Sequence, residues 1–165
     1  MPQNIHDNEW LPFYLRDHMA GATAGVNLFD RVAGGHSDYE VRTQVARLAS
    51  QVRQDRSDLG TIMTALGIRQ ISLTMLTGVL GELAGRFKPN GHLTTRSPGA
   101  DVLELEALAA AVQGKARVWE TLLARADRDP RLDTDQLQDL LDRATTQTQI
   151  LIGLHTRLVR ALPDQ

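Results

Sequence analysis

Two polar residues, His18 and Asp55, occupy positions in helical repeats that are otherwise filled by apolar residues. An imidazole can bind a metal or carry a proton near neutral pH, and a carboxylate can hold a cation or accept that proton. Buried polar groups need partners, because a lone buried charge is very costly. Counted outward from the turn expected at 34–36, the two residues lie within about one helical turn, ~5 Å, of each other in height. We therefore expect a structural hydrogen-bonded pair, with a ligand-binding or proton-transfer role, or exposure of one side chain, as the alternatives.

Three further polar residues, Asp58, Glu106 and His155, border the predicted helix interfaces. Asp58 lies three residues after Asp55 on one helix face, so the two could share a cation, although solvation of Asp58 beside arginines is the simpler interpretation. Glu106 could point into the bundle or lie on its flank, and His155 could join an interior polar cluster or keep one nitrogen in water. We assign no catalytic residue and no metal site. The candidate ligands, should a metal bind, are His18, Asp55, Asp58 and Glu106.

Composition excludes several classes of protein. The chain has 165 residues, with 42% apolar and 23% charged residues, which is ordinary for one globular domain. Its net charge of −2 argues against a protein that binds nucleic acid through bulk charge. It has no cysteine, which excludes disulfides and thiolate chemistry. No apolar run approaches the ~18 residues of a membrane span. The N-terminus lacks the blocks of a signal peptide, so we expect a cytoplasmic protein with no membrane partner.

Helical periodicity dominates the long segments of the chain. After an N-terminal tail at 1–8, it predicts long helices at 9–33, 37–66, 101–127 and 133–161. Ser37, Asp101 and Asp133 are the expected first residues of the last three helices, because each precedes Glu or Gln by three positions. Glycines at 34, 35 and 67 are expected to end the first two helices in the left-handed conformation.

A long connection at 67–100 separates the second and third predicted helices, and its residues 71–86 could form a short fifth helix. This connection is too long for the loop of a helical hairpin, which usually takes 2–8 residues. The fold class is therefore all-α, a single domain with two antiparallel hairpins joined by one long crossover. One long crossover is the connection of ferritin-like four-helix bundles.

Three stretches of the chain resemble an uncharacterised family of bacterial ferritin-like proteins. They are LRDHMAGATAG in the first helix, KPNGHLTTRSPG in the crossover and LELEAL at the start of the third helix. The resemblance covers nearly the whole chain and implies a ferritin-like four-helix bundle. Ferritin-like metal enzymes use Glu-x-x-His on two of their helices, which this sequence lacks.

Two functions remain open from the sequence. The missing ligand set favours a non-catalytic bundle, without a cofactor, that associates with itself or with another helical protein. The alternative is a bundle that binds a metal or a small molecule through its interior polar residues. No phosphate-binding loop or nucleophile motif points to an enzyme.

Overall fold

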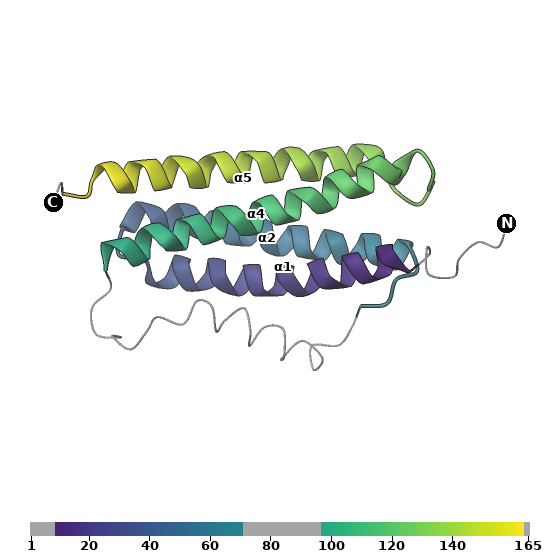
Figure 1. Ribbon diagram of the computed structural model, residues 1–165, viewed down its shortest axis with the longest axis horizontal. Coiled ribbons are helices and arrows are strands. Elements are labelled where there is room, and N and C mark those ends of the chain that lie inside the picture. Colours follow the sequence, from purple (N-terminus) through teal and green to yellow (C-terminus); the bar gives the residue numbers. More distant parts are fainter. Residues whose placement is uncertain (1–8, 71–96, 164–165) are drawn as a thin grey trace.

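The computed structural model describes residues 9–70 and 97–163, and in these residues it is all-helical. The helices are α1 (Trp10–Gly35), α2 (Tyr39–Ala65), α4 (Pro98–Ala126) and α5 (Thr134–Arg160) (Figure 1). These bounds agree with the four predicted long helices to within three residues at each end. The predicted tail at 1–8 and the short helix at 71–86 lie outside the described residues. No helix in the described part of the chain is both long and apolar enough to cross a membrane.

Side-chain caps fix where three of the helices begin. Asp133 accepts a hydrogen bond from the backbone N–H of Gln136 at 3.0 Å, which confirms the predicted start of α5. The predicted starts of the other two helices are wrong. Asp38, rather than Ser37, caps α2, and Ser97 caps α4 with Pro98 in the first turn. Asp101 is not needed as a cap because Ser97 already accepts from the first turn, and Pro98 is preset for a helical start.

The glycines at the helix ends behave differently from one another. Gly67 has φ +73° and follows the end of α2, as predicted, in the left-handed conformation that glycine adopts at low cost. Gly34 and Gly35 remain helical, and α1 ends at His36, whose backbone is extended. The expectation of a left-handed stop there is wrong, because the extended backbone of His36 and Asp38 forms the turn between the helices.

The helices form two antiparallel hairpins, α1 with α2 and α4 with α5, packed side by side (Figure 1). Tyr14 on α1 hydrogen-bonds Thr121 on α4 at 3.2 Å, so the start of α1 lies beside the end of α4. Ser37 before α2 donates to Asp101 at the start of α4, so both helices begin at the same end of the bundle. The chain between Ala65 and Pro98 therefore joins opposite ends of the bundle.

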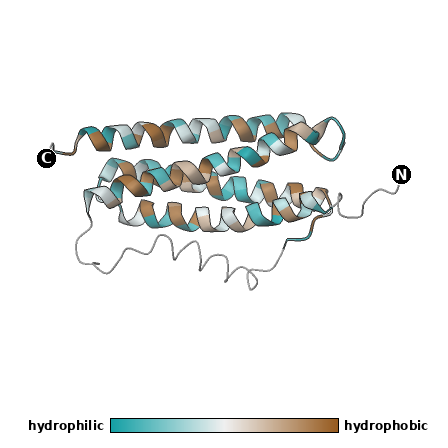
Figure 2. Ribbon diagram, viewed as in Figure 1, coloured by the Kyte–Doolittle hydropathy of each residue, from teal (hydrophilic) through white to brown (hydrophobic). Residues whose placement is uncertain are grey.

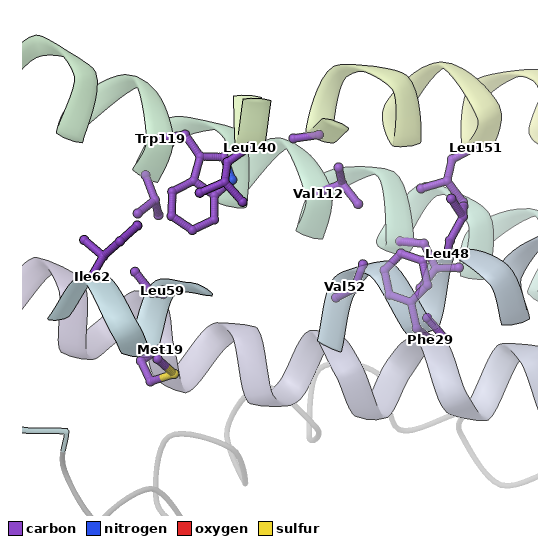
Figure 3. Packing of buried hydrophobic residues seen from close by; sticks show 14 of the residues in the cluster. Met19, Phe29, Leu48, Val52, Leu59, Ile62, Val112, Trp119, Leu140 and Leu151 are labelled. Carbon is purple, nitrogen blue, oxygen red and sulfur yellow. The ribbon is translucent and has the colours of Figure 1, made fainter. Parts of the chain in front are cut away.

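The core runs along the bundle axis, and brown apolar residues recur along each helix in Figure 2. Leu59, in the middle of the apolar stripe of α2, is 3% exposed. On α1, Met19 takes the buried position four residues after Leu15, and His18, which was expected in the apolar stripe, is half-buried beside it. On α4, Leu105, Leu108, Val112, Trp119 and Leu122 are among the buried residues. Figure 3 shows the packed apolar side chains in two groups, one around Trp119 and Leu59 and the other around Phe29 and Val52.

Candidate functional site

A network of charged and polar side chains lies inside the bundle, centred on Asp55 of α2. Asp55 is completely buried, and its Oδ2 accepts hydrogen bonds from Lys115 of α4 and, at 3.3 Å, from Gln147 of α5. Lys115 also donates to Oε1 of Gln147, whose amide nitrogen donates to Gln51 at 3.0 Å. Three helices therefore share one ammonium, one carboxylate and one amide in their common interior.

Arg143 of α5 adds a second cation to this network. Its Nε lies 3.0 Å from Oδ1 of Asp55, an ion pair in which Oδ1 still accepts no hydrogen bond. Its Nη2 donates to Asp58 at 3.1 Å, and Asp58 also accepts from Gln54. The expectation that Asp58 lies beside an arginine is confirmed, and here the arginine bridges Asp55 and Asp58.

Burial lowers the pKa of the Lys115 ammonium, an effect that the Asp55 carboxylate opposes. Desolvation disfavours any charged group, and a hydrogen-bonded carboxylate is the partner that best compensates an ammonium. The network therefore pairs Lys115 with a carboxylate that also contacts a second cation, Arg143.

Lys115 is not among the residues predicted from the sequence, although its spacing marks it. On α4, Lys115 falls three residues after Val112 and four before Trp119, both of which are buried. On α5, Gln147 falls in the same way between Ala144 and Leu151. α2, α4 and α5 thus each carry one polar residue near the middle of the apolar stripe, and a comparison of these three stripes position by position would have found the layer.

The predicted pair of His18 with Asp55 is wrong. Asp55 takes its partners from α4 and α5, and His18 packs edge-on against Tyr14 with ring centroids 4.4 Å apart. Partial burial lowers the pKa of His18, an effect that the nearby Asp17 carboxylate opposes. The ammonium of Lys115 is the stronger partner for a buried carboxylate, and it reaches Asp55 from α4.

Glu106 and His155 lie away from the interior network. Nε2 of His155 is 3.1 Å from Oε1 of Glu106, and this pair joins α4 to α5 at the bundle surface. The glutamate is exposed, as the flank interpretation predicted, and the histidine is half-buried. Neither side chain forms part of the Asp55 network.

A second polar cluster lies at the end of the bundle where α2 and α4 begin. Ligand atoms of His36, Asp101 and Glu104 lie within 4.8 Å of one another, the one such group found in residues 9–70 and 97–163. Nδ1 of His36 accepts the backbone N–H of Asp38 at 3.1 Å, so a neutral ring carries its proton on Nε2, the nitrogen that faces Asp101. A metal at Nε2 would require loss of this proton. The cluster therefore fits a structural role, in which its contacts hold the α1–α2 turn against α4.

The residues present do not fit the paired metal site of ferritin-like enzymes. A metal at the centre of the bundle would need carboxylates and imidazoles from several helices. The interior instead presents Asp55 with the Lys115 ammonium bonded to it. Any metal ion at Asp55 would have to displace or lie beside that ammonium.

A cavity of about 680 Å³ adjoins the Asp55–Lys115 pair, between α1, α2 and α4. Its α1 wall extends from His18 to Arg31 and its α4 wall from Ala107 to Trp119. At 1.5 Å per residue these walls are roughly 18–20 Å long. Its lining includes the exposed residues Gly21 and Asn27 of α1 and Ala110 of α4, so the cavity opens to solvent between these two helices.

Small residues on both walls account for the width of the cavity. The lining includes Gly21, Ala22, Ala24 and Gly25 on α1, and Ala107, Ala110, Ala111 and Gly114 on α4. A Cβ added at Gly21, Gly25 or Gly114 would meet no side chain, or backbone of another segment, within 4 Å. The backbone therefore does not require glycine at these positions, where the missing side chains leave space.

One buried donor of the lining has no partner. Trp119 is 1% exposed, it lines the cavity, and its indole Nε1–H forms no hydrogen bond. In Figure 3 the nitrogen lies on the side of the ring next to Leu140. A buried donor without a partner costs about 1–3 kcal/mol.

Comparisons of this chain with protein-family models, curated proteins and solved structures found no match.

Proposed function

We propose that this protein is a non-catalytic bundle that binds a small, largely apolar molecule in the cavity between α1, α2 and α4. The observation that carries the proposal is the cavity itself, at about 680 Å³, with a buried ion pair in its wall. Ligand pockets typically measure about 300–1,000 Å³ and combine an apolar lining with a few fixed polar groups. The cavity has this composition, and its polar groups are held rigidly by partners on three helices.

The proposal is tested with a neutral apolar fluorophore, N-phenyl-1-naphthylamine, titrated into the purified full chain. We expect saturable binding with an increase in fluorescence. Ala111→Leu, which adds bulk to the α4 wall, should weaken binding by about tenfold or more, a loss of ~1.4 kcal/mol. Ala124→Leu is the matched control, because Ala124 is exposed on the same helix and does not line the cavity. Equal affinities of both variants and the unmodified chain would overturn the proposal.

Self-association is a second candidate function, favoured by apolar side chains on the outer surface of α4 and α5. Leu103, Ile152 and Val159 are 62%, 52% and 44% exposed. They lie within four residues of Glu106 or His155, whose contact joins the two helices. A homodimer would cover them, so sedimentation equilibrium should show a dimer that Leu103→Lys with Ile152→Lys converts to a monomer. A monomeric unmodified chain would exclude this candidate.

We also propose that the chain has the ferritin-like connection and a cytoplasmic location. The antiparallel hairpins, with α2 and α4 starting at the same end, support the connection. In this proposal the bundle is kept and its centre contains an ion network in place of metal ligands.

A further inference from the structure

The cavity differs in polarity along its length. Its polar lining groups Asp55, Arg56, Lys115 and Trp119 lie on the α2 and α4 walls, near the end of the cavity marked by His18. The register fixed by Tyr14 and Thr121 places Lys115 level with roughly residue 20 of α1. Toward Phe29 the lining is apolar, apart from the exposed Asn27 and Arg31. A ligand that fills the cavity would therefore need one polar end and an elongated apolar body.

The charges at the polar end have an excess of cations. Lys115 and Arg56 line this end of the cavity, against the single carboxylate of Asp55. Arg143, which does not line the cavity, also contacts Asp55 from α5. Arg56 donates through Nε to Thr23 at 3.0 Å and forms no ion pair within residues 9–70 and 97–163. A bound anion would meet uncompensated positive charge, whereas a bound cation would have to compete for Asp55.

The hydrogen-bonding groups that lack a partner at the polar end of the cavity are mainly donors. The ammonium of Lys115 has three N–H groups, of which Asp55 and Gln147 accept two. The indole N–H of Trp119 is buried without a partner. Oδ1 of Asp55 accepts no hydrogen bond, but it already has the Arg143 guanidinium at 3.0 Å. The ligand group that satisfies this set is an acceptor with negative charge.

We propose that the ligand is an amphipathic carboxylic acid with an elongated apolar chain. Its carboxylate accepts from the free N–H of Lys115, with Arg56 adding positive charge. Its chain lies along the small residues of α1 and α4 toward Phe29. This inference rests on the proposed function, since it assigns the class of molecule that the cavity takes.

The test compares three probes of equal chain length, decanoate, decanol and decylamine, as competitors of N-phenyl-1-naphthylamine on the full chain. We expect decanoate to bind at least about tenfold more tightly than decanol, because a charge-assisted hydrogen bond contributes roughly 1.5–3 kcal/mol. Lys115→Met should abolish this preference. Arg56→Gln should reduce it several-fold without disturbing the Asp55 network, and so gives a readout even if Lys115→Met fails to fold. Arg53→Gln is the matched control, because Arg53 pairs with Asp30 on the exposed surface.

The outcomes separate this inference from the proposed function. Equal affinity for decanoate and decanol would overturn the assignment of an acid and leave a binder of neutral apolar molecules. Tighter binding of decylamine would show that Asp55, rather than Lys115, selects the ligand. A preference for decanoate that survives both Lys115→Met and Arg56→Gln would place the carboxylate elsewhere. Failure of the fluorophore and all three probes to bind would overturn the proposed function as well.

Discussion

At the scale of single residues, the central energetic feature is a buried carboxylate held by an ammonium. Removing one partner of a buried ion pair typically costs about 3–5 kcal/mol, because the other charge remains uncompensated. Lys115→Met should therefore lower the free energy of unfolding by about 3 kcal/mol. This value is at the lower end of the range because Arg143 still contacts Asp55. Asp55→Leu together with Lys115→Met should recover much of this loss. Urea denaturation of the four members of the cycle should give a coupling energy above the ~0.5 kcal/mol of independent sites.

An exposed ion pair on the same helix provides the contrast. Arg117 donates to Glu120 at 2.6 Å, with 74% of its side chain exposed. Surface pairs contribute about 0–1 kcal/mol, so Arg117→Met should change stability little. If Lys115→Met and Arg117→Met lower the free energy of unfolding equally, the buried Asp55 network contributes no more to stability than a surface ion pair does.

His18 gives a prediction about pH. Burial holds its pKa below the ordinary value of 6.5, so the unfolded chain takes up this proton more readily than the folded chain. Stability should therefore fall as pH decreases from about 6.5 toward the lowered folded pKa of this histidine. His18→Gln removes the titration, and the stability difference between the two proteins should narrow or reverse over this range in urea melts from pH 8 to 5. A difference that does not change with pH would mean that His18 titrates as in the unfolded chain.

At this scale, the polar residues that interrupt an apolar stripe could be recognised from the sequence more easily than their partners could. Asp55 stands out because a carboxylate interrupts an apolar stripe, and its burial is confirmed. Its partner depends on which neighbouring helix presents a suitable side chain at that level, and Lys115 of α4 does so while His18 packs against Tyr14. Side chains such as Lys115, with a long apolar stem, reach the interior from positions that a search for carboxylates and imidazoles passes over.

At the scale of helices, Arg157 links the end of α5 to the start of α2. Its Nη2 donates at 2.7 Å to Asp38, the N-cap of α2, and its Nε lies 3.2 Å from Glu40. The hydrogen bond from Arg157 lowers the pKa of Asp38 below its ordinary value of 3.8. The corresponding stabilisation is present above about pH 4 and is lost as pH falls through the lowered pKa.

Arg157→Gln should therefore reduce stability at pH 7 and flatten its dependence on pH below about 4. Chemical denaturation at pH 7, 4 and 3 checks this expectation. Arg160→Gln is the control, because Arg160 is exposed in the same last turn. Parallel stability curves for the unmodified chain and Arg157→Gln would contradict a role of this contact in acid unfolding.

The positions of the helices could be predicted from the sequence, because helical periodicity and capping residues depend only on neighbouring residues. The Asp133 cap and the Gly67 stop are both as predicted, since each depends on a few neighbouring residues. The Ser37 and Asp101 starts are wrong because several candidate caps adjoin each other, and Asp38 and Ser97 have the better geometry. Asp101, which does not cap α4, accepts a hydrogen bond from Ser37 and contacts His36. These residues lie 64 and 65 positions before it in the sequence, so a rule based on neighbouring residues could not predict the contacts.

At the scale of the whole molecule, the bundle contains a cavity whose walls carry glycine where a larger side chain would fit. Gly25 and Gly114 face each other's helices across the cavity, and neither glycine has a positive φ. Glycine within a helix is less stable than alanine by about 0.5–1 kcal/mol, because it loses more backbone freedom on folding. The chain therefore forgoes stability at the walls of this cavity, which is the pattern expected where a ligand needs the space.

Gly25→Ala and Gly114→Ala should each raise the free energy of unfolding by about 0.5–1 kcal/mol, since an added Cβ meets open space. Their effects should be nearly additive, and the double variant should bind N-phenyl-1-naphthylamine more weakly because two methyl groups then occupy the cavity. Gly153→Ala, on α5 and outside the cavity lining, should stabilise by a similar amount and leave binding unchanged. Urea melts and fluorescence titration of the same samples measure both quantities. Stabilisation without weaker binding in the double variant would show that the fluorophore occupies some other site, and destabilisation would show that the cavity walls are already in close contact.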